Sequence, residues 1–325
     1  MGARLLGSGH FVPSDTLTND DLARRVDTSD EWIVRRTGIR ARHVLADGEI
    51  PAEMAVAAGR GAIERAGIAP SAVDLLIVAT NFPDLICPGT APFVADGLGL
   101  GETPFFDLKA GCTGFVYGLA VADAMVAAGG CRHVLLIGSE ALSRVTDWLD
   151  RKTCVLFGDG AGAVVLGPGA SDEGVLATAV FGDPTKAMLL AIPAGGTRRP
   201  ASAETVEARE HFVRMEGAGV YRSAVPMMAR SLNTAIARAE LALADVDWII
   251  PHQANLRIIE SLVRRLGVEE DRVIVNLDRV ANTSTASIPI ALDEAIRDGR
   301  IERGQIVALT AFGAGATYAA AVIRM

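Results

Sequence analysis

The second half of this chain repeats the order of segments found in the first half, and this repeat constrains the fold more than any other feature. Val73–Ala79 is a short run of branched apolar residues, and Val246–Pro251 begins with the same Val-Asp pair. Both are followed by another apolar run, a turn, a helical segment, a third strand and a glycine-rich segment. These are Phe105–Cys112, Gly114–Ala128, Val134–Ile137 and Phe157–Leu166 in the first half, and Val273–Leu277, Ile288–Arg297, Ile306–Leu309 and Phe312–Tyr318 in the second. The shared order indicates an internal duplication.

The residue pattern within each repeat predicts an α/β fold with two similar halves. The short apolar runs predict strands of a parallel sheet, because such strands are covered on both faces. Ile288, Leu292 and Ala295 recur with helical spacing, which indicates an amphipathic helix. A cluster of turn-forming residues, Gly167–Gly174, separates the repeats. We therefore expect an N-terminal half over residues 1–169 and a C-terminal half over residues 170–325.

Composition and charge favour an enzyme and argue against several other classes of protein. Half of the 325 residues are hydrophobic, only 5% are aromatic and 34 are glycine, which suits an aliphatic core connected by tight turns. The net charge of −8 argues against binding to nucleic acid or anionic membranes. No apolar run reaches the roughly 18 residues of a membrane helix, and the first residues lack a secretory signal pattern. We expect a cytoplasmic protein.

Cys112 has the setting of a catalytic nucleophile. It follows a strand that ends at Gly111 and precedes a helix that begins near Gly114. The positive end of a helix stabilises a thiolate and lowers the pKa of a cysteine from about 8.5 to roughly 3.5–7.5. We therefore expect a lowered pKa, although a small buried cysteine without chemistry is the alternative. The other cysteines lack this setting, and the absence of a C-x-x-C pair argues against a metal site or a disulfide framework.

His252 and Asn282 lie at corresponding places in the second half. His252 follows an apolar strand, and the carboxyl ends of parallel strands carry ligand-binding groups in α/β proteins. Asn282 takes the place in the second repeat that Cys112 takes in the first. If the halves are related by a two-fold axis, both helix starts meet at one central site, and His252 opens onto it.

Seven segments together resemble the β-ketoacyl-[acyl carrier protein] synthase III family of thiolase-like condensing enzymes. They are Ser29–Ile33, Arg36–Ile39, Ala110–Gly114, Phe157–Gly162, Pro251–Asn255, Asn282–Ser287 and Phe312–Gly315. The order Cys, His, Asn also occurs in papain-like proteases. The residues around Cys112, however, lack the Cys-Gly-x-Cys-aromatic signature of that family.

The resemblance implies a five-layer αβαβα fold, a homodimer and an acyltransferase that needs neither metal nor redox cofactor, since the CoA thioester is a substrate. It implies that Cys112 takes the acyl group from an acyl-CoA. The acyl group then passes to malonyl-acyl carrier protein, which loses CO2 and yields a 3-oxoacyl-acyl carrier protein. His252 and Asn282 would stabilise the enolate formed by decarboxylation. The backbone N–H groups of Cys112 and Ala314 would stabilise the acyl-transfer oxyanion.

The resemblance also implies three binding regions. Thr28, Trp32, Arg36 and Arg151 match the positions that hold CoA. Leu142, Phe157 and Leu189 match the acyl channel, and Cys87 reaches its end from the partner subunit, where several relatives carry Phe. The smaller Cys87 predicts acceptance of branched or longer donors than acetyl. Arg222, Arg257, Arg264 and Arg265 would form a positive patch for the acidic carrier protein, although a solvated helix face is the ordinary interpretation of such a cluster.

The sequence departs from the family pattern at two positions, and two other functions are consistent with it. Ala281 and Ala314 stand where the family usually has glycine, which affects loop conformation rather than the class of reaction. One alternative is a related condensing enzyme or acyltransferase of polyketide or secondary metabolism. The other is a non-catalytic subunit that binds acyl thioesters, but a complete set of Cys112, His252 and Asn282 argues against it.

Overall fold

The first half of the chain forms a five-stranded sheet in the computed structural model, which describes residues 2–170 and 172–325. In spatial order its strands are β1 (Ala3–Phe11), β7 (Asp159–Pro168), β6 (Val134–Ala141), β4 (Leu75–Ala79) and β5 (Phe105–Leu108). Strands β6, β4 and β5 run parallel, whereas β7 is antiparallel to both of its neighbours. Strand β6 is buried along its whole length, as expected for a strand covered on both faces.

The second half forms a four-stranded sheet with a similar arrangement. Its order is β11 (Trp248–Pro251), β12 (Ile306–Gly313), β13 (Thr317–Arg324) and β8 (Gly174–Gly182). One parallel pair is followed by two antiparallel pairs, whereas the first sheet has two parallel pairs beside its two antiparallel ones. The predicted boundary between residues 169 and 170 lies in the connection from β7 to β8. Met1 and Ser171, the second of which belongs to the predicted joint, lie outside the described residues.

The predicted strand Val273–Leu277 is wrong. Only one bridge forms here, between Val273 and Ile249 of β11, at the position that β5 occupies beside β4. The backbone N–H of Asn276 donates instead to the side-chain Oε1 of Gln253, and helix α9 (Leu277–Val280) begins at the next residue. The segment leaves the sheet because a side chain takes the place of a neighbouring strand.

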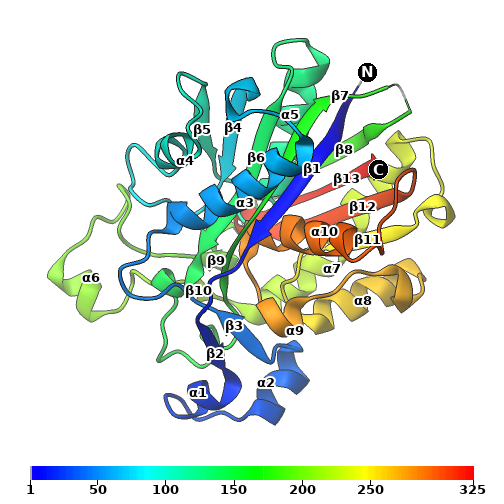
Figure 1. The fold of residues 1–325 in the computed structure, drawn as a ribbon. Helices are drawn as coiled ribbons and strands as arrows, with labels where there is room; N and C mark the ends of the chain where they lie inside the picture. The colour runs from blue at the N-terminus through cyan, green and yellow to red at the C-terminus, as the bar shows by residue number, and fades with distance from the viewer. Residues whose placement is uncertain (1, 171) are drawn as a thin grey trace.

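Helices separate and cover the two sheets in a five-layer stack (Figure 1), which confirms the fold predicted from the resemblance. Helices α5 (Gly114–Ala127) and α10 (Ser287–Arg297) lie between the sheets. The outer face of the first sheet carries α3 (Pro51–Ala66) and α4 (Ala91–Leu98), and that of the second carries α7 (Gly217–Arg238), with α8 (Leu256–Leu266) packed against it.

Smaller elements complete the fold outside these layers. They are α1 (Asn19–Ala23), α2 (Asp30–Thr37), α6 (Ala203–Glu207), the strand pair β2 (Thr16–Thr18) and β3 (Ala41–His43), and the pair β9 (Leu190–Ala191) and β10 (Arg214–Met215). Among the described residues, the structure contains no helix with the length and apolar character needed to cross a bilayer.

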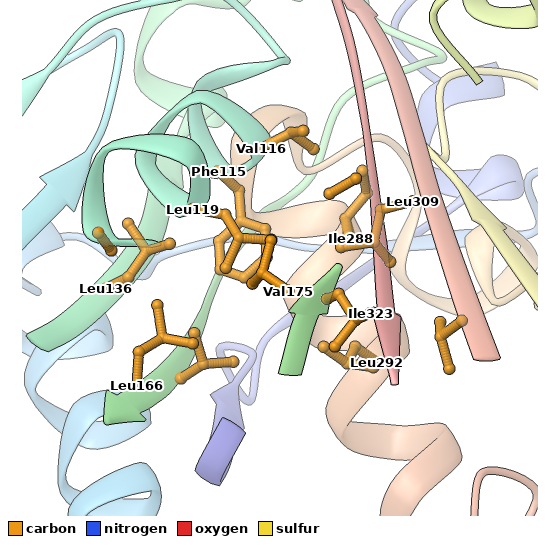
Figure 2. Packing of buried hydrophobic residues seen from close by; sticks show 14 of the residues in the cluster. Phe115, Val116, Leu119, Leu136, Leu166, Val175, Ile288, Leu292, Leu309 and Ile323 are labelled. Atoms are coloured by element: carbon orange, nitrogen blue, oxygen red, sulfur yellow. The ribbon is translucent and has the colours of Figure 1, made fainter. Parts of the chain in front are cut away.

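The aliphatic core between the sheets holds the two central helices in place. Phe115 and Leu119 of α5 pack with Ile288 and Leu292 of α10 (Figure 2). Leu136 of β6 joins this core, whereas its neighbours along the strand point to the opposite face and pack under α3. With both helices anchored between the sheets, the residues just before their N-terminal ends meet at one place.

Candidate active site

Cys112, His252 and Asn282 line one cavity of about 560 Å³. Cys112 lies just before α5, His252 directly follows β11, and Asn282 lies in the turn that leads to α10. The structure therefore brings together the three residues that the sequence singles out. In residues 2–170 and 172–325, no group of three or more His, Cys, Asp or Glu side chains forms a cluster that could hold a metal.

The backbone around Cys112 packs directly against the loop after β12. A Cβ atom built on Gly313 would lie 2.4 Å from the backbone nitrogen of Cys112. Gly111 has a φ of +59°, and a Cβ atom there would lie 2.5 Å from the backbone nitrogen of Ala314. These glycines bring the N–H groups of Cys112 and Ala314 close together beside the sulfur, where both lower the pKa of the thiol. They are the two N–H groups that the resemblance implies for the oxyanion site.

The expected lowering of the Cys112 pKa is wrong for this structure. Burial raises the pKa of the thiol to about 11, although the residue keeps some surface toward the cavity. The Ser284 hydroxyl, whose oxygen lies 3.4 Å from the sulfur, and the two backbone N–H groups lower the pKa, but by less. Glu140 raises it further by its negative charge. Cys112 lies outside helix α5, which begins two residues later at Gly114. The resting thiol therefore keeps its proton.

His252 is held as a neutral imidazole. The residue is 2% exposed, and burial lowers its pKa to about 3. Its Nδ1 lies 2.7 Å from the Ser287 hydroxyl oxygen, which also accepts the backbone N–H of Gln253 at 3.3 Å. Among the described residues, Nδ1 is the only acceptor within hydrogen-bond distance of the Ser287 hydroxyl, so the hydroxyl donates its proton to Nδ1 and the imidazole proton is then on Nε2. His252 can therefore donate a hydrogen bond at the cavity.

Asn282 is held by its own turn and by the loop before β7. Its backbone donates to Leu156 and accepts from Gly158, and its side-chain Oδ1 accepts the N–H of Ser284 at 2.9 Å. The Nδ2 group is then the part of the amide left to donate into the cavity. The preceding residue, Ala281, has φ 60° and ψ −160°, a conformation that favours glycine and costs other residues about 1–3 kcal/mol.

Sequence reasoning missed two polar residues beside the thiol, Ser284 and Glu140. The Ser284 hydroxyl lies 3.1 Å from Oε1 of Glu140 and 3.4 Å from the Cys112 sulfur. Glu140 is 1% exposed. A signal for it existed in the sequence, since it is the one carboxylate in the otherwise uncharged run Val134–Ala141, near the carboxyl end of a predicted strand.

The residues assigned to CoA lie around Trp32 at the mouth of the cavity. Trp32 and Arg36 line the cavity, and Arg36 lies 5.7 Å from the centre of the indole ring. Arg151 stacks on the same ring at 4.1 Å and lies 3.9 Å from Asp27. Thr28 has a buried hydroxyl without a hydrogen-bond partner among the described residues. Neither Arg151 nor Thr28 borders the cavity itself.

Of the residues assigned to the acyl channel, one lines the cavity, one is buried behind it and two lie outside its wall. Phe157 lines the cavity, and Leu142 is buried in the same apolar cluster behind it. Leu189 packs on Gly219 of α7, whereas its neighbour Leu190 borders the cavity. Cys87 is exposed on the surface of the single chain and does not reach the cavity.

The four arginines assigned to carrier-protein docking lie on α7 and α8. Arg222 and Arg257 line the cavity at its open side, and Arg222 pairs with Glu216 at 3.5 Å. Arg264 donates to the Ser261 hydroxyl at 2.9 Å, and Arg265 is exposed beside it. A second hollow of about 360 Å³ is bordered by Arg257 together with Arg35 and Arg36 of α2.

Comparisons with known proteins show the family to which the chain belongs. The family model described as 3-oxoacyl-[acyl-carrier-protein] synthase III matches residues 106–190, and its C-terminal model matches residues 236–325. β-Ketoacyl-[acyl-carrier-protein] synthase III of Thiobacillus denitrificans is 47% identical over 99% of both chains. The solved structure of the Thermus thermophilus synthase III is 43% identical over 99% of both chains, with a TM-score of 0.92.

A priming β-ketosynthase from a polyketide biosynthetic pathway is also similar in structure. It is 36% identical, the match covers 99% of this chain and 95% of that one, and the TM-score is 0.91. The full-length identity to named synthases exceeds what a shared fold alone would give. The chain belongs to the β-ketoacyl-[acyl-carrier-protein] synthase III family of condensing acyltransferases.

Proposed function

We propose that this chain joins an acyl-CoA primer to malonyl-acyl carrier protein, using Cys112 as nucleophile and His252 and Asn282 as hydrogen-bond donors. The products are a 3-oxoacyl-acyl carrier protein, CO2 and free CoA, and the reaction begins type II fatty-acid synthesis. The supporting observation is that these three side chains line one cavity whose mouth carries Trp32 and Arg36. None of the steps transfers electrons to or from a redox group.

In the first half-reaction, the Cys112 sulfur attacks the thioester carbon of the acyl-CoA. The carbonyl oxygen gains negative charge, and the backbone N–H groups of Cys112 and Ala314 are positioned to stabilise it. The tetrahedral species then expels the CoA thiolate, and the acyl group stays on Cys112. Direct packing of the two backbones through Gly111 and Gly313 keeps both donors at fixed positions.

In the second half-reaction, the malonyl thioester loses CO2 and becomes an enolate. The Nε2–H of His252 and the Nδ2–H of Asn282 are suited to bind the enolate oxygen, because Ser287 and Ser284 occupy their other polar atoms. A neutral donor suffices here, so the low pKa of His252 does not oppose this role. The enolate carbon attacks the acyl group, and the Cys112 thiolate leaves.

The positive charges at the cavity mouth support the substrate assignments. Guanidinium groups pair with phosphate, and a Trp face stacks on adenine. Arg151 now covers the Trp32 ring at 4.1 Å, so an adenine between the two requires Arg151 to move outward. The exposed Arg264 and Arg265 on α8 do not line the cavity and offer opposite charge to an acidic carrier protein.

A homodimer is supported by apolar residues at the free edge of the first sheet. Strand β5 is the last strand of that sheet, and its Phe105 and Phe106 are 44% and 40% exposed. Ile86, the residue directly before Cys87, is 90% exposed. An uncovered edge strand with exposed aromatics is a typical site for association. A partner seated there would carry its own Cys87 toward the acyl channel.

A role in polyketide priming is a second candidate, favoured by the similarity to the polyketide β-ketosynthase. The test exposes the enzyme to acetyl-CoA, then measures intact mass and maps the acyl adduct. An adduct on Cys112 that is absent in Cys112→Ser supports the assignment, and one on Cys131 or Cys154 refutes it. A panel of acyl-CoA donors assayed with malonyl-acyl carrier protein then distinguishes the two pathways by primer preference.

A further inference from the structure

The reaction leaves one proton without an acceptor. Cys112 must lose its thiol proton during acyl transfer, and burial holds that proton firmly, with a pKa of about 11. His252 has its Nδ1 bound to Ser287 and its proton on Nε2, so its imidazole acts as a donor toward the cavity. Another group near the Cys112 sulfur must therefore accept the thiol proton.

Ser284 contacts the sulfur and a buried carboxylate at the same time. Its Oγ lies 3.4 Å from the Cys112 sulfur and 3.1 Å from Oε1 of Glu140. A hydroxyl has one proton and two lone pairs, so it can give its proton to the carboxylate while it accepts the thiol proton. Ser284 has a φ of +50°, an uncommon conformation for a residue other than glycine, and such conformations gather at active sites.

Glu140 has the surroundings of a group that gains and loses a proton. It is 1% exposed, and no Lys, Arg or His pairs with it among the described residues. Its carboxylate accepts the backbone N–H of Asn81 at 3.2 Å, the Asn81 side-chain amide and the Ser284 hydroxyl. Burial raises its pKa to about 7, even though these donors oppose the rise. Cys112 is an ionisable group that faces it.

We propose that Ser284 and Glu140 form a proton relay that takes the Cys112 proton during acyl loading and returns it after condensation. Ser284 touches the reacting sulfur, and Glu140 is a positioning residue that acts through it. This proposal rests on the proposed function, since it assumes that Cys112 is the nucleophile. It assigns a role to a buried carboxylate that the mechanism above leaves unused.

The proton balance closes over one turnover. During loading, the Cys112 proton passes to Ser284, the Ser284 proton passes to Glu140, the sulfur–acyl bond forms and the CoA–acyl bond breaks. The released CoA thiolate takes a proton from solvent. During condensation, the carbon–carbon bond forms and Cys112 leaves as a thiolate, which recovers the proton stored on Glu140 through Ser284. The net uptake is one solvent proton for each CoA released.

The experiment measures how fast Cys112 reacts with iodoacetamide between pH 5.5 and 10, with the labelled site identified by peptide mass. A carboxylate that accepts the proton must be ionised, so the wild-type rate should rise through about pH 7 and then level off. In Glu140→Gln and Ser284→Ala this rise should disappear. Reactivity should return only at alkaline pH, and at pH 7.5 the rate should be about 100-fold lower.

A matched control separates the relay from simple loss of a buried hydroxyl. Ser143 also bonds through its hydroxyl to a buried carboxylate, that of Asp159, away from Cys112. Ser143→Ala should keep the wild-type pH profile. Ser284→Ala retains Glu140 and keeps the test valid if Glu140→Gln fails to fold, as judged by thermal denaturation.

The outcomes distinguish the relay from the proposed function. If acetyl-CoA and iodoacetamide both fail to label Cys112 in the wild-type enzyme, the nucleophile assignment fails and the relay fails with it. If Cys112 is labelled but Ser284→Ala keeps the rise near pH 7 and the wild-type rate, only the relay is overturned. An equal loss in Ser143→Ala also overturns it, because the effect would then be structural.

Discussion

Replacing Gly313 with alanine tests whether the rate of acyl transfer depends on close backbone packing beneath the nucleophile. Gly313 has φ −143° and ψ 175°, which alanine adopts without strain, so the substitution acts by its added methyl group alone. That Cβ would lie 2.4 Å from the Cys112 nitrogen and 3.0 Å from the nitrogen of Thr113. Since ordinary contact begins near 3.4 Å, the segment that carries Cys112 must move by about 1 Å.

A shift of this size should affect chemistry far more than stability. Misplacement of a reacting group by about 1 Å costs on the order of 100-fold in rate. Overpacking of a close contact costs about 1–3 kcal/mol in the free energy of unfolding, which lowers the melting temperature by several degrees. We therefore expect Gly313→Ala to fold but to acylate Cys112 about 100-fold more slowly in a single-turnover assay with acetyl-CoA, followed by intact mass.

Gly182→Ala provides the matched control for this experiment. Gly182 ends β8 beside the same loop, but the nearest atom to an added Cβ is the Ala316 carbonyl oxygen at 4.0 Å. This variant should acylate at the wild-type rate. The packing argument is refuted if Gly313→Ala acylates within threefold of wild type, or if Gly182→Ala slows equally.

Three further variants test the other parts of the site. Ser287→Ala removes the hydrogen-bond partner of the His252 Nδ1, so the imidazole tautomer is no longer fixed. Malonyl decarboxylation should then slow about 10- to 100-fold while Cys112 loading stays unchanged. Equal slowing of both half-reactions would contradict this role. Cys87→Phe should shift donor preference toward acetyl-CoA in a competition assay, because a larger side chain from the partner shortens the channel; an unchanged donor profile would exclude Cys87 from the pocket. Replacement of Arg264 and Arg265 by Glu should raise the KM for malonyl-acyl carrier protein at low salt. Acyl-CoA loading should stay intact, because neither residue lines the cavity. A KM unchanged from wild type would show that this face does not dock the carrier protein.

The strand, turn and helix pattern of the chain determines the fold and the three main site residues. Cys112 and Asn282 could be placed because each lies between elements whose apolar spacing is local, and His252 because it ends such a strand. The duplication then relates the two halves, so the sequence alone predicts a site where they meet. Val273 shows the limit of this reasoning, since its apolar run forms only one bridge once Gln253 bonds to Asn276.

Only the tertiary structure decided the charge state of the nucleophile and the identity of its polar neighbours. The helix start predicts a lowered pKa for Cys112, but burial by segments from both halves raises it. Ser284 and Glu140 are 144 positions apart, and neither reveals in its own sequence neighbourhood that the other contacts it. Desolvation and hydrogen bonding sum over all atoms around a group, whichever segments supply them, whereas sequence periodicity reports only what lies within a few turns of the same chain segment.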